Sequence, residues 1–107
     1  MIKKPKKYAN LQYDAFLKRY ENIEEAILLD VRTHQEYEDT HLPAAINIDL
    51  KSADFLDEIA TLDQQKSYFI YCSKGIRSVN VCIVMKQMGF LKLYNLKGGL
   101  SAQNKHK

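Results

Sequence analysis

One of the two cysteines lies in a short loop with the residue types that a nucleophilic thiol needs. The loop reads Cys72-Ser73-Lys74-Gly75-Ile76-Arg77-Ser78. It follows the apolar stretch 67–71 and precedes a segment with a helical pattern, so the N–H groups at the start of that helix face the thiol. Gly75 lets the backbone curl and direct N–H groups inward, and Lys74 and Arg77 add positive charge. These features favour a reactive Cys72 thiolate.

The segments that must position this loop alternate between two patterns. Short apolar runs predict strands at 26–31, 45–48, 67–72 and 91–96. Helical patterns cover 13–20, 35–38, 52–60 and 77–88. This alternation predicts a small α/β domain with a mainly parallel central sheet and helices on both faces. Asp30 and Cys72 both end strands, and in such sheets the active crevice lies beyond the carboxyl ends of the strands.

The composition fits one ordinary globular domain. The 107 residues are 46% hydrophobic and 27% charged, and a chain of this size buries one core without disulfides or metals. We therefore expect a single domain over 1–107, with the basic segment 1–7 as a frayed tail.

Charge, apolar runs and cysteine spacing limit which partners and which cellular location we expect. The formal charge of +3 is too small to indicate nucleic-acid binding, and no apolar run has the length of a signal peptide or a membrane span. The two cysteines match neither a disulfide framework nor a zinc motif. We expect a cytoplasmic protein with free thiols and with no nucleic-acid or membrane partner.

Three motifs, in family order, resemble the rhodanese family of sulfurtransferases. The loop fits the active-loop pattern C-x-x-G-x-R-S/T throughout. Upstream, Asp30-Val31-Arg32, Glu36-Tyr37 and the stretch from His41 to Ile48 are similar to the first family signature, and Leu96-Lys97-Gly98-Gly99 is similar to its closing L-x-G-G. The resemblance covers about residues 8 to 103.

Three positions depart from the family pattern. Thr40 and Ala44 replace the two glycines that usually flank the His-x-Pro step, and Gln103 stands where many relatives have tryptophan. We expect these changes to affect loop geometry and C-terminal packing and to leave the chemistry intact. Because the sequence stops soon after Gln103, we also expect the final helix of larger relatives to be short or missing.

The resemblance implies that Cys72 forms a persulfide. Its thiolate would take the outer sulfur of a small anionic donor such as thiosulfate, expel sulfite, and pass the sulfur to cyanide, a thiol or a protein acceptor. Arg77 joins Cys72 as a catalytic residue, and the residues expected to bind substrate are Ser73, Lys74, Gly75, Ile76 and Ser78. Backbone N–H groups of the loop would stabilise the anionic persulfide. Lys74 and Arg77 would attract the donor, Ser78 would cap the helix and close the loop, and no metal or organic cofactor is needed.

Four further residues are interpreted as structural support for the loop: Asp30, Arg32, Glu36 and His41. Arg32 and Glu36 are four residues apart, which predicts an ion pair that fixes the turn. His41 is interpreted as a hydrogen-bonded structural residue, because no cluster of metal-ligating residues accompanies it. Cys82 lies in the apolar part of a helix, where we expect a small buried side chain.

Two alternatives remain open at this point. A cysteine phosphatase or arsenate reductase on the same fold would need one more residue in the loop, since C-x5-R is the phosphatase pattern and only four residues separate Cys72 from Arg77. It would also need a general acid, which no residue clearly supplies. A non-enzymatic persulfide carrier or interaction module would keep the same loop.

Overall fold

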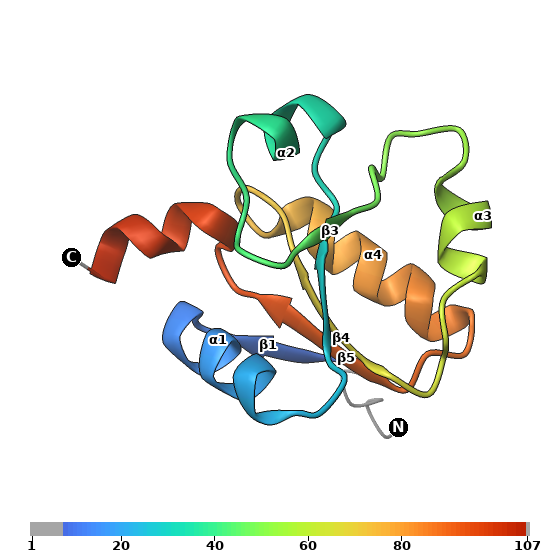
Figure 1. Ribbon diagram of the computed structural model, residues 1–107, viewed down its shortest axis with the longest axis horizontal. Helices are drawn as coiled ribbons and strands as arrows, with labels where there is room; N and C mark the ends of the chain where they lie inside the picture. Colours follow the sequence, from blue (N-terminus) through green and yellow to red (C-terminus); the bar gives the residue numbers. More distant parts are fainter. Residues whose placement is uncertain (1–7, 107) are drawn as a thin grey trace, which may run out of the picture.

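Five parallel strands form the central sheet of the computed structural model, which describes residues 8–106. The sheet order is β1-β5-β4-β2-β3 (Figure 1). The strands are β1 Ala9–Leu11, β2 Ile27–Asp30, β3 Ile46–Asn47, β4 Ser67–Tyr71 and β5 Lys92–Leu96. The basic tail expected at residues 1–7 lies outside the described residues. The prediction of an α/β domain with a parallel sheet is confirmed.

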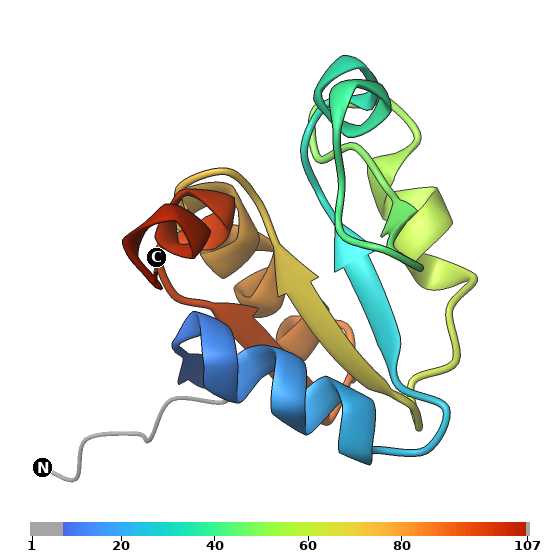
Figure 2. The ribbon, with the colours of Figure 1, turned by 60° about the vertical axis from the view of Figure 1, so that its left-hand side comes forward.

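Helices cover both faces of this sheet (Figure 2). They are α1 Tyr13–Asn22, α2 His34–Asp39, α3 Phe55–Ala60, α4 Ile76–Gln87 and the 3-10 helix η1 Gly99–His106. The region that was expected to hold a short or missing final helix therefore contains η1. Within residues 8–106, none of these helices has both the length and the apolar character that crossing a membrane requires.

Alternating side chains on the strands build two cores. On β4, Tyr68 and Ile70 pack into the core that α3 and α4 cover, and Cys72, just beyond the strand, belongs to the same core. Phe69 and Tyr71 point the opposite way, into the core that α1 covers. All five residues of β4 are buried, which explains why its sequence is an almost continuous apolar run.

The strand register brings the two predicted strand ends together. β2 and β4 pair in parallel with Asp30 opposite Tyr71, so Asp30 and Cys72 lie at the same edge of the sheet. The loop that starts with Cys72 therefore begins at the carboxyl edge of the sheet, as expected for this class of fold.

Two elements differ from the sequence prediction. β1 was not predicted, because three residues are too few to show a strand pattern. The strand forms by pairing with β5 at the sheet edge. α3 begins at Phe55 rather than Ser52, because the preceding residues form turns closed by bonds from the Ser52 amide to the Asp49 carbonyl and from the Phe55 amide to the Ser52 carbonyl.

Candidate functional site

Cys72 is the floor of a tight loop between β4 and α4. Its side chain is almost completely buried, with 1% exposed. The Sγ atom accepts hydrogen bonds from the Gly75 amide, at 3.1 Å, and from the Ser78 amide, at 3.3 Å. Two backbone donors aimed at one sulfur form an environment that favours negative charge on it.

Gly75 gives the loop its shape. Its φ of +91° lies in the left-handed region, and it is the N-cap of α4. A Cβ atom at this position would lie 2.9 Å from the Gly98 amide nitrogen. Both observations require glycine, and they confirm the predicted curl of the loop.

Ser78 closes the loop but does not cap the helix. The cap position is Gly75, so Ser78 is the third helical residue and its side chain is buried. The Ser78 Oγ atom lies 3.3 Å from the Cys72 Sγ atom. The predicted capping role is therefore wrong, because the helix starts three residues earlier than that role requires.

Arg77 anchors the loop to α2 through Glu36. The guanidinium donates from Nη1 to Glu36 Oε1, at 2.7 Å, and from Nη2 to Oε2, at 3.0 Å. The Ser73 hydroxyl donates to the same carboxylate at 2.9 Å. Glu36 also accepts from the Thr33 amide, which completes a capping box at the start of α2. The guanidinium of Arg77 lowers the pKa of the Glu36 carboxyl, and Glu36 in turn raises the pKa of Arg77.

The prediction of an ion pair between Arg32 and Glu36 is wrong. Among the described residues, Glu36 pairs with Arg77, and Arg32 pairs with Asp30 at 2.7 Å. The reason is that Arg32 lies before the start of α2, so the helical spacing between residues four apart does not apply to it.

Asp30 and Arg32 form a buried network under the site. Arg32 also donates to the Thr40 carbonyl, and the Asn47 side chain donates to the carbonyls of Asp30 and Arg32. The Leu42 amide donates to the Tyr71 hydroxyl at 3.1 Å. This network ties β2, β3 and the segment between them to β4, and the supporting role of Asp30 and Arg32 for the loop stays a prediction.

His41 lies beside this network and is exposed. Its Nδ1 atom is 2.8 Å from the Tyr37 carbonyl oxygen, so Nδ1 carries the proton and donates. The imidazole stacks on the Tyr37 ring, with centroids 3.8 Å apart. Among the side chains that the structure describes, no three from His, Cys, Asp or Glu are grouped to hold a metal ion.

The segment that starts with Gly98 and Gly99 packs against the backbone of the Cys72 loop. The sequence interpretation did not assign this role to it. The amides of Leu100 and Ser101 donate to the carbonyls of Cys72 and Ser73, both at 2.9 Å. A Cβ atom on Gly99 would lie 2.5 Å from the Cys72 carbonyl oxygen. The signal that could have revealed this contact was the pair of consecutive glycines directly after a predicted strand.

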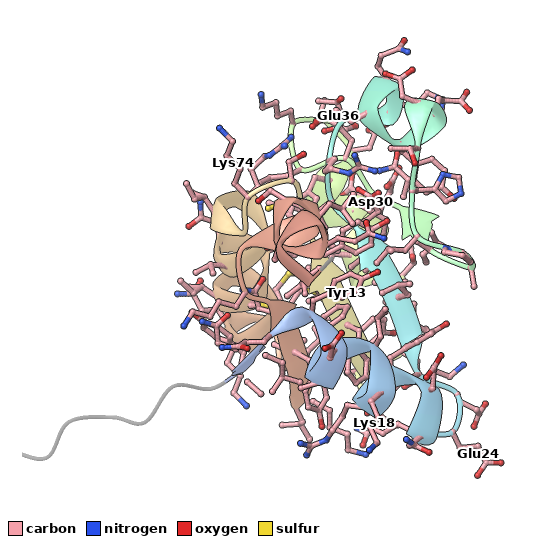
Figure 3. The ribbon with its side chains drawn as sticks, turned by 90° about the vertical axis from the view of Figure 1, so that its left-hand side faces the viewer. Tyr13, Lys18, Glu24, Asp30, Glu36 and Lys74 are labelled. Carbon is pink, nitrogen blue, oxygen red and sulfur yellow. The ribbon has the colours of Figure 1, made fainter. Side chains whose placement is uncertain are left out.

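A cavity of about 460 Å³ opens above Cys72. We call it the mouth, and its lining residues are Glu36, Cys72, Ser73, Lys74, Ile76 and Arg77. Ile76 is 71% exposed at its rim, and Figure 3 shows Lys74 and Glu36 at the same end of the molecule. Across residues 8–106, no carboxylate lies within ion-pair distance of Lys74. Because Glu36 neutralises Arg77, Lys74 supplies the net positive charge of the mouth.

Cys82 belongs to the core rather than to the site. It is fully buried in α4, and burial raises the pKa of its thiol to about 12. The prediction of a small buried side chain is confirmed.

Comparisons with known proteins agree with the motifs. The sequence model of the rhodanese-like domain matches residues 13–106. Over 88 residues, the chain is 36% identical to "Putative sulfurtransferase YtwF" of Bacillus subtilis, covering 82% of each chain. It is 30% identical over 80 residues to "Thiosulfate sulfurtransferase GlpE" of Coxiella burnetii, covering 75% of this chain and 73% of that protein.

The fold comparison points the same way. A crystal structure of a rhodanese-like domain protein from Staphylococcus aureus superposes with a TM-score of 0.76 at 23% identity, covering 88% of this chain and 89% of that one. Since the family model spans most of the chain and the relatives match over most of their length, the chain belongs to the rhodanese-like domain family.

Proposed function

We propose that this protein is a sulfurtransferase that carries a sulfane sulfur as a persulfide of Cys72. The observation that carries the proposal is the environment of the Cys72 Sγ atom, which is buried and accepts hydrogen bonds from the amides of Gly75 and Ser78. The curated relatives named as sulfurtransferases support it. The loop of four residues between Cys72 and Arg77 also suits one sulfur atom better than a tetrahedral phosphate.

In the first half-reaction, the Cys72 thiolate attacks the outer sulfur of thiosulfate. A new S–S bond forms, the S–S bond of the donor breaks, and sulfite leaves with the electron pair. Lys74 attracts the dianionic donor to the mouth, because it is the cation there without a carboxylate partner among residues 8–106.

In the second half-reaction, an acceptor thiolate or cyanide attacks the outer sulfur of the persulfide. The S–S bond breaks and its electron pair returns to Cys72, which leaves as a thiolate. The amide donors of Gly75 and Ser78 stabilise this leaving thiolate, so the same two hydrogen bonds serve both half-reactions.

The test is the intact mass of the protein after incubation with thiosulfate. We expect a gain of one sulfur atom, matched by released sulfite, reversed by reductant and absent in Cys72→Ala. Thiocyanate produced over many turnovers with cyanide distinguishes an enzyme from a carrier, which would load and discharge once. Hydrolysis of an aryl phosphate without any gain of sulfur would instead support the phosphatase alternative.

A further inference from the structure

A second cavity adjoins the mouth and shares Ser73 and Lys74 with it. We call it the side groove. Its volume is about 440 Å³, within the range of about 300–1,000 Å³ that is typical of small-molecule sites. Its wall includes Arg32, Leu42, Pro43, Lys74, Leu100 and Gln103. A small inorganic donor needs only the mouth, so the side groove offers space for the rest of a larger molecule whose reacting end lies in the mouth.

The charges around the side groove favour an anion. No acidic residue lines it, and the positive charge of Arg32 is already paired with Asp30. In the mouth, Glu36 contributes a carboxylate, but Arg77 neutralises it. Lys74 therefore stands at the shared rim as an exposed cation without a carboxylate partner among the described residues.

The position of Cys72 fixes how an acceptor approaches. Because its side chain is 1% exposed, an acceptor thiol must enter the mouth to reach the persulfide. The remainder of the acceptor must then lie across the rim that Ser73 and Lys74 form, and the adjoining side groove is the cavity beyond that rim.

We propose that the sulfur acceptor is a thiol that carries a carboxylate, with its thiol in the mouth, its carboxylate at Lys74 and its remaining atoms in the side groove. This inference rests on the proposed function. The acceptor thiolate forms a bond to the outer sulfur of the Cys72 persulfide, the S–S bond breaks, and the electron pair stays on Cys72. The acceptor leaves as a persulfide, and no outside oxidant or reductant is needed.

The experiment uses protein that has been loaded with thiosulfate and then freed of the donor. Its discharge by four thiols is followed by intact mass: neutral 2-mercaptoethanol, anionic 3-mercaptopropionate, cationic cysteamine, and glutathione, a larger thiol with carboxylates. Rates are compared at equal thiolate concentration, because the reactive fraction depends on the pKa of each thiol. We expect 3-mercaptopropionate to react about threefold to fivefold faster than 2-mercaptoethanol, and cysteamine more slowly, with differences that shrink at high salt.

Variants test the contribution of Lys74 at the rim separately from that of the side groove. Lys74→Gln should abolish the preference for anionic thiols, and Lys74→Glu should reverse it. Lys18→Gln removes the same charge at the opposite end of the molecule (Figure 3) and should leave the preference intact. Gln103→Glu places a carboxylate in the side groove. It should lower the rate of discharge by glutathione by about threefold and change the rate with 3-mercaptopropionate little.

The outcomes distinguish this inference from the function on which it rests. If the persulfide forms normally but all four thiols discharge it equally, the acceptor inference is overturned and the sulfurtransferase proposal stands. The assignment of the site is also overturned if Lys74→Glu still reacts faster with anionic thiols. The same holds if glutathione discharges Gln103→Glu at the wild-type rate. If thiosulfate never loads Cys72, the proposed function fails first, and the inference fails with it.

Discussion

Arg77 and Glu36 are separated by 41 residues and form a two-point ion pair, with N–O distances of 2.7 and 3.0 Å, that ties the cysteine loop to α2. The pair turns a cation of the loop into a structural anchor, since its positive charge is neutralised where a substrate would meet it. Ser73 bonds the same carboxylate, so both flanks of the loop are held by one side chain.

We expect Arg77→Lys to impair sulfur transfer through kcat, because lysine keeps the charge but cannot bond both carboxylate oxygens in parallel. Loosening the loop should lower kcat with thiosulfate and cyanide by about tenfold or more, with little change in KM. Lys74→Ala is the matched comparison, since it removes charge without removing an anchor and should raise KM by about threefold. Steady-state kinetics measure kcat and KM for both variants. An increase in KM without a decrease in kcat for Arg77→Lys would show that Arg77 binds the donor.

Acid should weaken the fold through Glu36. Since Arg77 lowers the pKa of this carboxyl in the native state, the unfolded chain takes up its proton at higher pH than the folded one. The stabilisation is present above the unfolded-state pKa of about 4.3 and is lost as the pH falls below it. Glu36→Gln should therefore lower the free energy of unfolding at neutral pH and flatten its decline in acid.

Urea denaturation at a series of pH values measures this effect. Glu24→Gln is the control, because Glu24 is exposed and lies at the opposite end of the molecule from Glu36 (Figure 3). The control should keep the acid slope of the wild type. Equal slopes in all three proteins would contradict the assignment of the acid response to Glu36.

Gly99→Ala should damage the loop more than Gly98→Ala. Both glycines have positive φ, +63° and +77°, so alanine is strained by about 1–2 kcal/mol at either position. Only at Gly99 would the new Cβ collide with the loop backbone, at 2.5 Å from the Cys72 carbonyl oxygen; at Gly98 it would meet the Ala102 Cβ at 3.3 Å. We expect about 1–3 kcal/mol of additional destabilisation and loss of persulfide formation in Gly99→Ala. Thermal unfolding and intact mass measure both effects, and identical behaviour of the two variants would contradict the contact.

The parts of the site that follow from local sequence were predictable. The apolar run of β4, the glycine in the loop and the helix after it place Cys72 at a strand end under backbone donors. The partner of Arg77 was not predictable from spacing, because Glu36 comes from a distant segment and the four-residue spacing favoured Arg32 instead. The short strand β1 was missed for a related reason: its three residues are ordered by pairing with β5, a contact that local sequence does not encode.

Ala44→Gly should stabilise the protein. Ala44 adopts a φ of +70°, which is unfavourable for alanine, at a position where the family resemblance leads us to expect glycine. Relief of this strain, less the greater flexibility of glycine in the unfolded chain, should raise stability by about 0.5–1 kcal/mol and the Tm by about 2–8 °C. The neighbouring Ala45→Gly is the control: Ala45 is buried without positive φ, so glycine there should lower the Tm. Calorimetry of both variants decides, and a lower Tm in Ala44→Gly would show that the strain is compensated elsewhere.

Substitution of Cys72 and substitution of Cys82 should have different effects on activity. Both are free and buried in the same core, but the amides of Gly75 and Ser78 point at the Cys72 Sγ atom, whereas burial raises the pKa of Cys82 to about 12. A thiol with that pKa stays protonated at neutral pH and is a poor nucleophile.

Cys72→Ala should therefore abolish both persulfide formation and thiocyanate production while the protein remains folded. Cys82→Ala should lower stability by about 1–2 kcal/mol, through the lost packing of one buried sulfur, and keep most of the activity. Circular dichroism establishes that both variants are folded before the assays are compared. A folded Cys82→Ala protein without activity, beside an active Cys72→Ala protein, would transfer the nucleophilic role to Cys82 and overturn the site proposed for this domain.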